Sequence, residues 1–179
     1  IELLNLYYKD FDFLGIDIVE NQIMQAKRNY PSYKFSCCDI FSLDSLNKYE
    51  LINATGVFQH ETKYKRLLKF LWDRTSKYFL FDVKFLDYKK DLNNINKAFC
   101  NIDNNLVPFI ILSPQVFFNY LRKLRNLQSV NIIAYETEKN SITTLPSNIK
   151  RMISAGILLE KKNSKTKLQN EFINYDQSL

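Results

Sequence analysis

The chain has 179 residues, 46% of them hydrophobic and 15% aromatic, which is enough for one well-packed domain. Its net charge is +6, but the lysines are spread along the sequence instead of forming one dense basic block, so nucleic acid is not favoured as a partner. Three cysteines cannot build a disulfide framework. Because there is also no signal peptide and no apolar run long enough for a membrane span, we expect a soluble, cytoplasmic protein.

The first part of the chain predicts a strand, a helix and a second strand. Phe11–Ile18 is short and apolar, Glu20–Tyr30 has helical spacing, and Tyr33–Asp39 alternates and ends in an acid. A βαβ unit points both strands the same way, so Asp17 and Asp39 should lie at the same end of a parallel sheet. Two carboxylates at neighbouring strand ends suggest a nucleotide-shaped ligand.

The alternation of strands and helices continues in the middle of the chain. Tyr49–Gly56 is predicted as a strand, residues 61–75 as a helix, and Lys77–Phe85 as a strongly apolar strand. The helix has an apolar stripe made of Tyr64, Leu67, Leu68, Leu71 and Trp72. This order predicts an α/β fold with a doubly wound, mostly parallel sheet and helices on both faces.

Residues 86–112 interrupt the alternation with a polar, Asn-rich stretch. An insertion at this edge of a parallel sheet often forms a lid or a substrate loop, but it suits a plain connection equally well. Ser113 is predicted to cap a helix over Pro114–Asn126, and strands follow at Ser129–Thr137 and Ala155–Lys162. Without a helix between them, the two strands should form a C-terminal antiparallel hairpin. We expect one domain over residues 1–162 and a polar tail over 163–179.

Three segments resemble the class I, seven-stranded S-adenosylmethionine-dependent methyltransferases: FLGIDIVENQIMQAKRNYPSYKFSCCDI, KYELINATGVFQH and KYFLFDVKF. The similarity covers nearly the whole chain and implies S-adenosylmethionine as the cofactor. It implies that Asp17 binds the ribose hydroxyls, next to Ile18, and that Asp39 faces the adenine amino group, with Ile40 against the ring. Both acids also suit the simpler task of capping the turns that follow them.

The segment ATGVFQH follows the third predicted strand, where the family lines the junction between cofactor and acceptor. The resemblance implies cofactor contacts from Thr55, Gly56 and Val57. His60 is the only histidine, and a histidine can act as general base on an acceptor hydroxyl near neutral pH. It also suits a helix start without chemistry. The expected reaction is methyl transfer to an unidentified small-molecule acceptor held by residues near His60 and by residues 86–112.

The sequence departs from the family at the glycine-rich loop that contacts the methionine part of the cofactor. Gly15 lies inside a predicted strand, and no G-x-G pattern occurs. Since helical spacing is already present from Ile1, we expect the first strand and its loop to lie upstream. Without them two strand edges stay unpaired, and we expect this chain to bind the cofactor poorly on its own.

Other functions stay open. A nicotinamide-binding Rossmann domain also places an acid after its second strand, and a catalytically silent domain could keep this fold as an interaction module. Methylation of nucleic-acid amino groups would need an Asn/Asp-Pro-Pro-aromatic motif where this chain reads ATGVFQH. No metal site is expected, because the cysteines and His60 lack the spacing of metal ligands.

Overall fold

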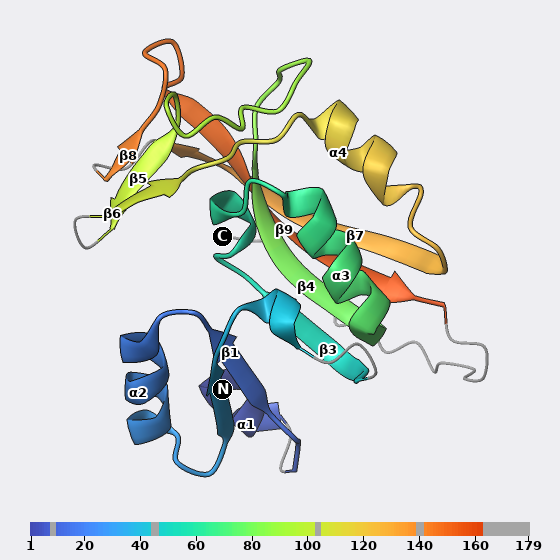
Figure 1. The fold of residues 1–179 in the computed structure, drawn as a ribbon. Coiled ribbons are helices and arrows are strands. Elements are labelled where there is room, and N and C mark those ends of the chain that lie inside the picture. The colour runs from blue at the N-terminus through green and yellow to red at the C-terminus, as the bar shows by residue number, and fades with distance from the viewer. Residues whose placement is uncertain (8–9, 44–46, 103–104, 139–141, 163–179) are drawn as a thin grey trace. The chain divides into compact units, whose positions relative to one another are not determined.

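The computed structural model describes residues 1–7, 10–43, 47–102, 105–138 and 142–162 (Figure 1). The chain divides into two compact units, Ile1–Asn47 and Lys48–Leu179. The predicted tail at 163–179 lies outside the described residues. In the part of the chain that the structure describes, no helix is both long and apolar enough to cross a membrane.

The first unit is a β–α–β arrangement preceded by a short helix. It consists of α1 (Glu2–Tyr7), β1 (Leu14–Asp17), α2 (Glu20–Asn29) and β2 (Lys34–Cys37), followed by the 3-10 turn η1 (Ile40–Ser42). Strands β1 and β2 pair in parallel, with Asp17 opposite Cys37. The predicted parallel unit is therefore confirmed.

Gly15 makes room for an aromatic cluster on one face of this strand pair. In the β1–β2 register Gly15 lies opposite Phe35, and a Cβ atom added to Gly15 would lie 2.5 Å from Cδ1 of Phe35. The Phe35 ring packs edge-on against Phe13, with 5.7 Å between centroids, and Phe13 packs in the same way on Tyr33 at 5.5 Å. A side chain at position 15 would displace this cluster.

The second unit is built on a four-stranded sheet in the order β3–β4–β9–β7. The strands are β3 (Tyr49–Ala54), β4 (Thr75–Phe85), β7 (Leu127–Glu138) and β9 (Arg151–Lys161). Strands β3 and β4 are parallel, as predicted, and β9 is antiparallel to both β4 and β7. The predicted C-terminal hairpin is thus confirmed, and its last strand lies inside the sheet.

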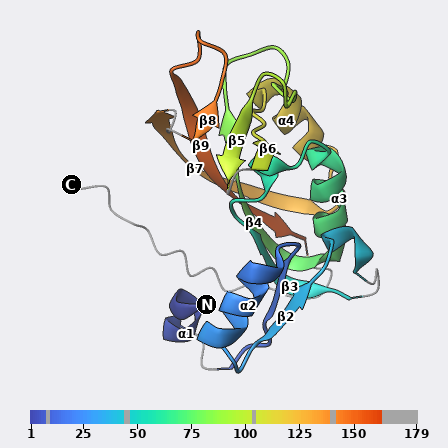
Figure 2. The same ribbon diagram turned by 60° about the vertical axis from the view of Figure 1, so that its left-hand side comes forward.

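Helices α3 (Tyr64–Arg74) and α4 (Pro114–Leu121) cover one face of this sheet (Figures 1 and 2). The stripe predicted for α3 is buried at all five positions. Phe117 of α4 is also buried, and its ring lies 6.4 Å from Tyr64, 6.2 Å from Phe81 and 5.3 Å from Phe85. Both helices and β4 therefore share one aromatic core.

Helix α4 ends earlier than the sequence predicts. After Leu121 the chain turns, and Asn126 adopts a left-handed conformation with φ 62°. The carbonyl oxygen of Arg125 accepts a hydrogen bond from the indole N–H of the buried Trp72 at 3.0 Å. A buried indole needs such an acceptor, which favours the turn over a further helical turn. Ser113 does occupy the predicted N-cap position, but its side chain makes no capping bond.

Two strands of a third sheet lie within residues 86–112, where the sequence indicated an insertion. Strands β5 (Phe99–Ile102) and β6 (Asn105–Pro108) form a hairpin, and β8 (Thr143–Thr144) pairs with the other edge of β5. The sequence did not predict these strands. One face packs on a buried cluster of Ala98, Cys100, Phe109, Ile111, Leu145, Ile149 and Met152.

Candidate functional site

The two predicted acids of the first unit lie at the carboxyl ends of adjacent parallel strands. The backbone N–H of Cys38 donates to the carbonyl oxygen of Asp17 at 3.0 Å, so the strands are still side by side there. Oδ1 of Asp17 accepts from the N–H of Val19 at 2.8 Å, and Oδ1 of Asp39 accepts from the N–H of Phe41 at 2.9 Å. Both acids are exposed, and no other described residue bonds to the second oxygen of either.

Aliphatic side chains accompany these carboxylates. Ile18 is 71% exposed and Val19 is 49% exposed, although both follow the strand directly. Ile40 is half-buried at the start of η1. A charged acceptor beside an uncovered apolar side chain suits a ligand that combines hydroxyl groups with a flat ring.

In the second unit, Thr55, Gly56 and Val57 form the exposed turn after β3. Gly56 has φ +77°, in the left-handed region that favours glycine. Its N–H donates to Oδ1 of Asp82 on β4 at 2.5 Å. Asp82 thus fixes the turn, although its place in the sequence did not identify it as a site residue. An acid within the apolar stretch KYFLFDVKF was the available signal.

His60 lies in the 3-10 turn η2 (Phe58–His60), which the buried Phe58 fastens to the sheet. Its Nδ1 is 2.8 Å from the carbonyl oxygen of Pro108, at the end of β6. A carbonyl can only accept, so Nδ1 carries the hydrogen and the neutral ring keeps its lone pair on Nε2. The amide nitrogen of Gln59 lies 3.4 Å from Nε2. His60 therefore has the tautomer that a general base needs.

Asp91 joins the chain between β4 and β5 to both α3 and α4. Its Oδ2 accepts from the hydroxyl of Tyr64 at 2.8 Å, and its Oδ1 accepts from the N–H of Ser113 at 2.8 Å. Burial, and then the bond to Asp91, raise the pKa of the Tyr64 hydroxyl well above its ordinary value. The hydroxyl consequently stays protonated into the alkaline range and continues to donate there.

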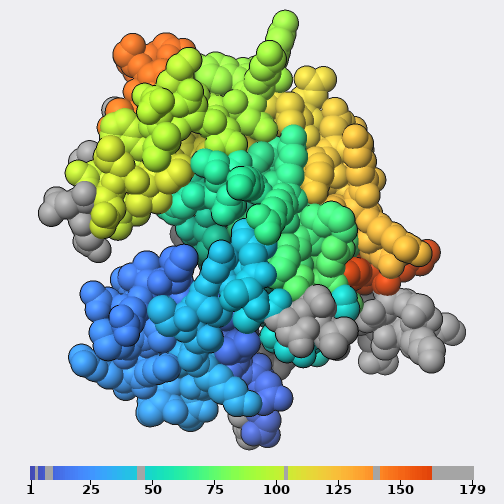
Figure 3. Space-filling model, in the orientation of Figure 1, coloured from blue at the N-terminus to red at the C-terminus, as the bar shows by residue number. Residues whose placement is uncertain are grey.

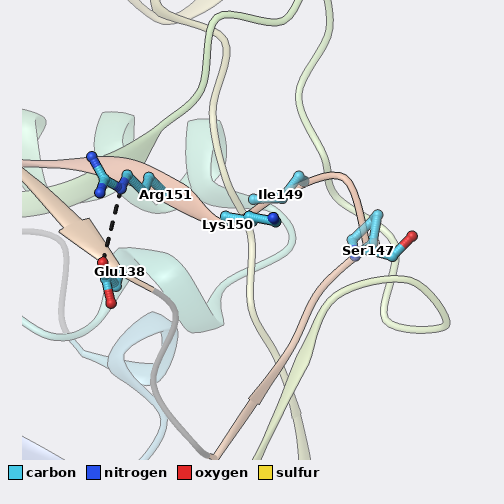
Figure 4. A pocket seen from close by; sticks show the side chains of 6 residues that line it. Glu138, Ser147, Ile149, Lys150 and Arg151 are labelled. Atoms are coloured by element: carbon cyan, nitrogen blue, oxygen red, sulfur yellow. Dashed lines mark ion pairs between the residues drawn. The ribbon is translucent and has the colours of Figure 1, made fainter.

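A surface hollow near the ends of β7 and β9 contains none of the predicted site residues (Figure 4). Its lining is Glu138, Pro146, Ser147, Ile149, Lys150 and Arg151. Arg151 lies 3.8 Å from Glu138, and both side chains are mostly exposed, so this pair contributes little. In the residues that the structure describes, no three His, Cys, Asp or Glu side chains gather to hold a metal ion.

The structure brings the predicted residues together in two groups. Asp17, Ile18, Asp39 and Ile40 gather in the first unit, and residues 55–60 form one continuous turn in the second. That both groups contact one cofactor stays a prediction.

The sequence matches no protein-family model, and no curated protein matches it. Solved structures do match. The N-terminal domain of EvdMO1, solved in the presence of SAH and D-fucose, has a TM-score of 0.63 at 13% identity, over 90% of this chain and 71% of that chain.

Two further structures are similar. A putative S-adenosylmethionine-dependent methyltransferase from Listeria monocytogenes has a TM-score of 0.55 at 15% identity, over 85% of this chain and 81% of that chain. Magnesium protoporphyrin IX methyltransferase from Synechocystis PCC 6803, with bound SAH, has a TM-score of 0.54 at 11% identity, over 89% and 68%. At these identities the likeness concerns the fold. This chain therefore has the fold of the class I S-adenosylmethionine-dependent methyltransferases.

Proposed function

We propose that the protein binds S-adenosylmethionine and transfers its methyl group to a small-molecule acceptor. The observation that carries this proposal is the pair Asp17 and Asp39, at the carboxyl ends of adjacent parallel strands in a class I methyltransferase fold. In open α/β sheets, ligands bind at this end of the strands.

The chemistry of the two acids fits the nucleoside half of the cofactor. Each carboxylate uses one oxygen to hold its own turn, and the other can accept a bond from a ligand. Asp17 would accept from the ribose hydroxyls and Asp39 from the adenine amino group, while Ile18 offers its exposed side chain to the ring. Hydrogen bonds to a charged group contribute roughly 1.5–3 kcal/mol each.

His60 is the residue that we propose as general base. The bound cofactor supplies an electrophilic methyl group, so the chain has to align the acceptor and remove its proton. The bond from Nδ1 to Pro108 leaves the lone pair on Nε2 of His60. Nε2 can take that proton once the acceptor displaces the amide nitrogen of Gln59, which lies 3.4 Å away. The positive charge that forms on the ring is then stabilised by the same carbonyl oxygen.

Adenosine is the probe that tests the nucleoside site directly. The N–H groups of Val19 and Phe41 donate to the two carboxylates, so their NMR signals should shift when adenosine binds. Asp17→Ala should weaken adenosine binding at least tenfold, as expected for a lost charge-assisted bond. The matched control is Asp12→Ala, which removes an exposed acid that precedes β1.

A second titration uses 2′-deoxyadenosine. Removing one ribose hydroxyl should weaken binding to the unsubstituted protein and should have little further effect on Asp17→Ala. Equal affinity of both nucleosides for the unsubstituted protein would contradict the role of Asp17. Much tighter binding of NAD than of S-adenosylhomocysteine would favour the nicotinamide alternative.

A further inference from the structure

The sheet formed by β5, β6 and β8 has no charged residue in its described strands. Its strand residues are Phe99–Ile102, Asn105–Pro108 and Thr143–Thr144, whereas 25% of the whole chain is charged. The hairpin of β5 and β6 nevertheless lies at the surface of the second unit, as the yellow-green spheres in Figure 3 show. These described strands therefore present no charged side chain.

Side-chain alternation gives this sheet two different faces. Cys100 and Thr143 are opposite each other, point to the inner face and are buried. The neighbouring positions point the other way. This outer face consists of Phe99, Asn101, Leu106, Pro108, Ile142 and Thr144. Two of its large apolar side chains are uncovered: Leu106 is 62% exposed and Ile142 is 50% exposed.

Leu106 and Ile142 lie on either side of the middle strand. Asn101 is the register partner of Leu106, and its N–H donates to the carbonyl oxygen of Ile142 at 3.0 Å. The two apolar side chains therefore flank one neutral amide side chain. An apolar ring lying on this face can contact Leu106 at one edge and Ile142 at the other. The amide of Asn101 between them can form a hydrogen bond with the ligand.

The same sheet continues directly to the proposed general base. Pro108 belongs to the outer face, and its carbonyl oxygen holds Nδ1 of His60 at 2.8 Å. Next to it, the N–H of Ile110 donates to the carbonyl oxygen of Gln59 at 2.8 Å. The side-chain oxygen of Gln59 is buried and has no partner in the described part of the chain.

We propose that the outer face of the β6–β5–β8 sheet binds the methyl acceptor and selects a neutral, apolar small molecule with one hydroxyl group. The apolar body lies against Leu106 and Ile142, and the polar group is directed along β6 toward His60 and Gln59. This inference rests on the proposed methyl transfer. A charged acceptor is disfavoured because no described residue of this face carries an opposite charge that would compensate its loss of hydration.

The experiment uses 2-naphthol as a neutral probe and 2-naphthoate as its charged analogue, both titrated at pH 7 and followed by NMR. We expect 2-naphthol to shift the backbone signals of Asn101 and Leu106, and 2-naphthoate to bind at least tenfold more weakly. Leu106→Asp and Ile142→Asp should each weaken 2-naphthol binding at least tenfold. Ile133→Asp is the matched control, since Ile133 is 80% exposed on a different sheet.

Several results would overturn the inference. One is that 2-naphthol and 2-naphthoate bind with equal affinity. Another is that 2-naphthol shifts only NMR signals from other parts of the chain. A third is that Leu106→Asp binds 2-naphthol as tightly as the unsubstituted protein. Concentration-dependent self-association that Leu106→Asp abolishes would identify a second copy of the chain as the occupant instead. Adenosine is titrated into the same samples. If adenosine fails to bind while 2-naphthol binds as expected, this chain alone does not form the proposed nucleoside site and the apolar site remains.

Discussion

The two groups of candidate residues are held in place in different ways. In the first unit, Asp17 and Asp39 each bond to a backbone N–H two residues further along the chain. In the second unit, Gly56 is fixed by Asp82, which is 26 residues away, and His60 by Pro108, which is 48 residues away. The first group is built from local contacts, whereas the second depends on the tertiary structure. Substitutions in the core should therefore disturb the second group of residues more than the first.

The largest effect should come from Phe117→Ala in the shared aromatic core. Removing a buried phenylalanine costs about 3–5 kcal/mol of unfolding free energy. Trp72, the only tryptophan, lies in the second unit, so its fluorescence during urea unfolding reports on that unit alone. Phe118→Ala, at a half-buried position, should cost less than half as much. Equal losses for both variants would contradict the central role of Phe117.

Tyr64→Phe tests the anchor between α3 and Asp91. Losing a hydrogen bond to a carboxylate should lower the unfolding free energy by about 1.5–3 kcal/mol at pH 7. Folding raises the pKa of Tyr64 above its ordinary 10.0, so the folded protein holds this proton when the unfolded chain has lost it. Stability should consequently fall above about pH 10, and more steeply in the unsubstituted protein than in Tyr64→Phe. Identical alkaline slopes would show that Tyr64 does not cause the fall.

Gly15→Ala tests whether the first unit also depends on a distant contact. The added methyl group would meet the ring of Phe35, which should cost about 1–3 kcal/mol. Amide hydrogen exchange in β1 and β2 measures this loss. Gly156→Ala in β9 is the control, because its Cβ would meet only a backbone oxygen at 3.9 Å. If the amides of β1 and β2 exchange faster in Gly156→Ala than in Gly15→Ala, the contact between position 15 and Phe35 does not stabilise the first unit.

Asp82→Ala should release the turn at Gly56. We expect a loss of about 1.5 kcal/mol, at the lower end for a bond to a charged acceptor because Gly56 is exposed. Asp82→Asn keeps an oxygen that can accept from the Gly56 N–H and should recover most of the stability. The exchange rate of the Gly56 amide distinguishes the two variants. If Asp82→Asn is as unstable as Asp82→Ala, the charge and not the bond is what matters.

The smallest change in stability should follow substitution of Asp17. Its capping bond to Val19 is exposed, so Asp17→Ala should cost about 1 kcal/mol, and Asp17→Asn should cost less. Thermal unfolding followed by circular dichroism measures both. A loss larger than that of Asp82→Ala would reverse the comparison between the local and the long-range group.

Local patterns in the sequence predicted much of the fold. The stripe of α3 and the strand pairs β1–β2 and β3–β4 were identified because apolar spacing is a local property. Strands β5, β6 and β8 were missed because they are short, and β8 pairs with a strand more than forty residues earlier in the chain. The end of α4 depends on the Trp72 indole, which no pattern near residue 121 reveals.

Contacts between residues far apart in the sequence also explain which residues of the candidate site were not predicted. Asp17, Asp39 and His60 stand out by residue type and by their place after a strand. Asp82 and Pro108 act only through contacts with residues far away in the sequence, and a proline carbonyl has no signal of its own. The partners that hold the second group in place were therefore visible only in the structure.

The place of β9 in its sheet has a consequence for synthesis on the ribosome. Strand β7 pairs only with β9 among the described strands of the sheet, and β9 also covers the second edge of β4. Until residues 151–161 have left the ribosome, the edge of β4 that β9 covers in the folded sheet has no partner. Such edges associate readily with other chains. We expect nascent chains whose residues 151–161 are still inside the ribosome to bind chaperones that recognise extended apolar segments, and release to follow the pairing of β9 with β4.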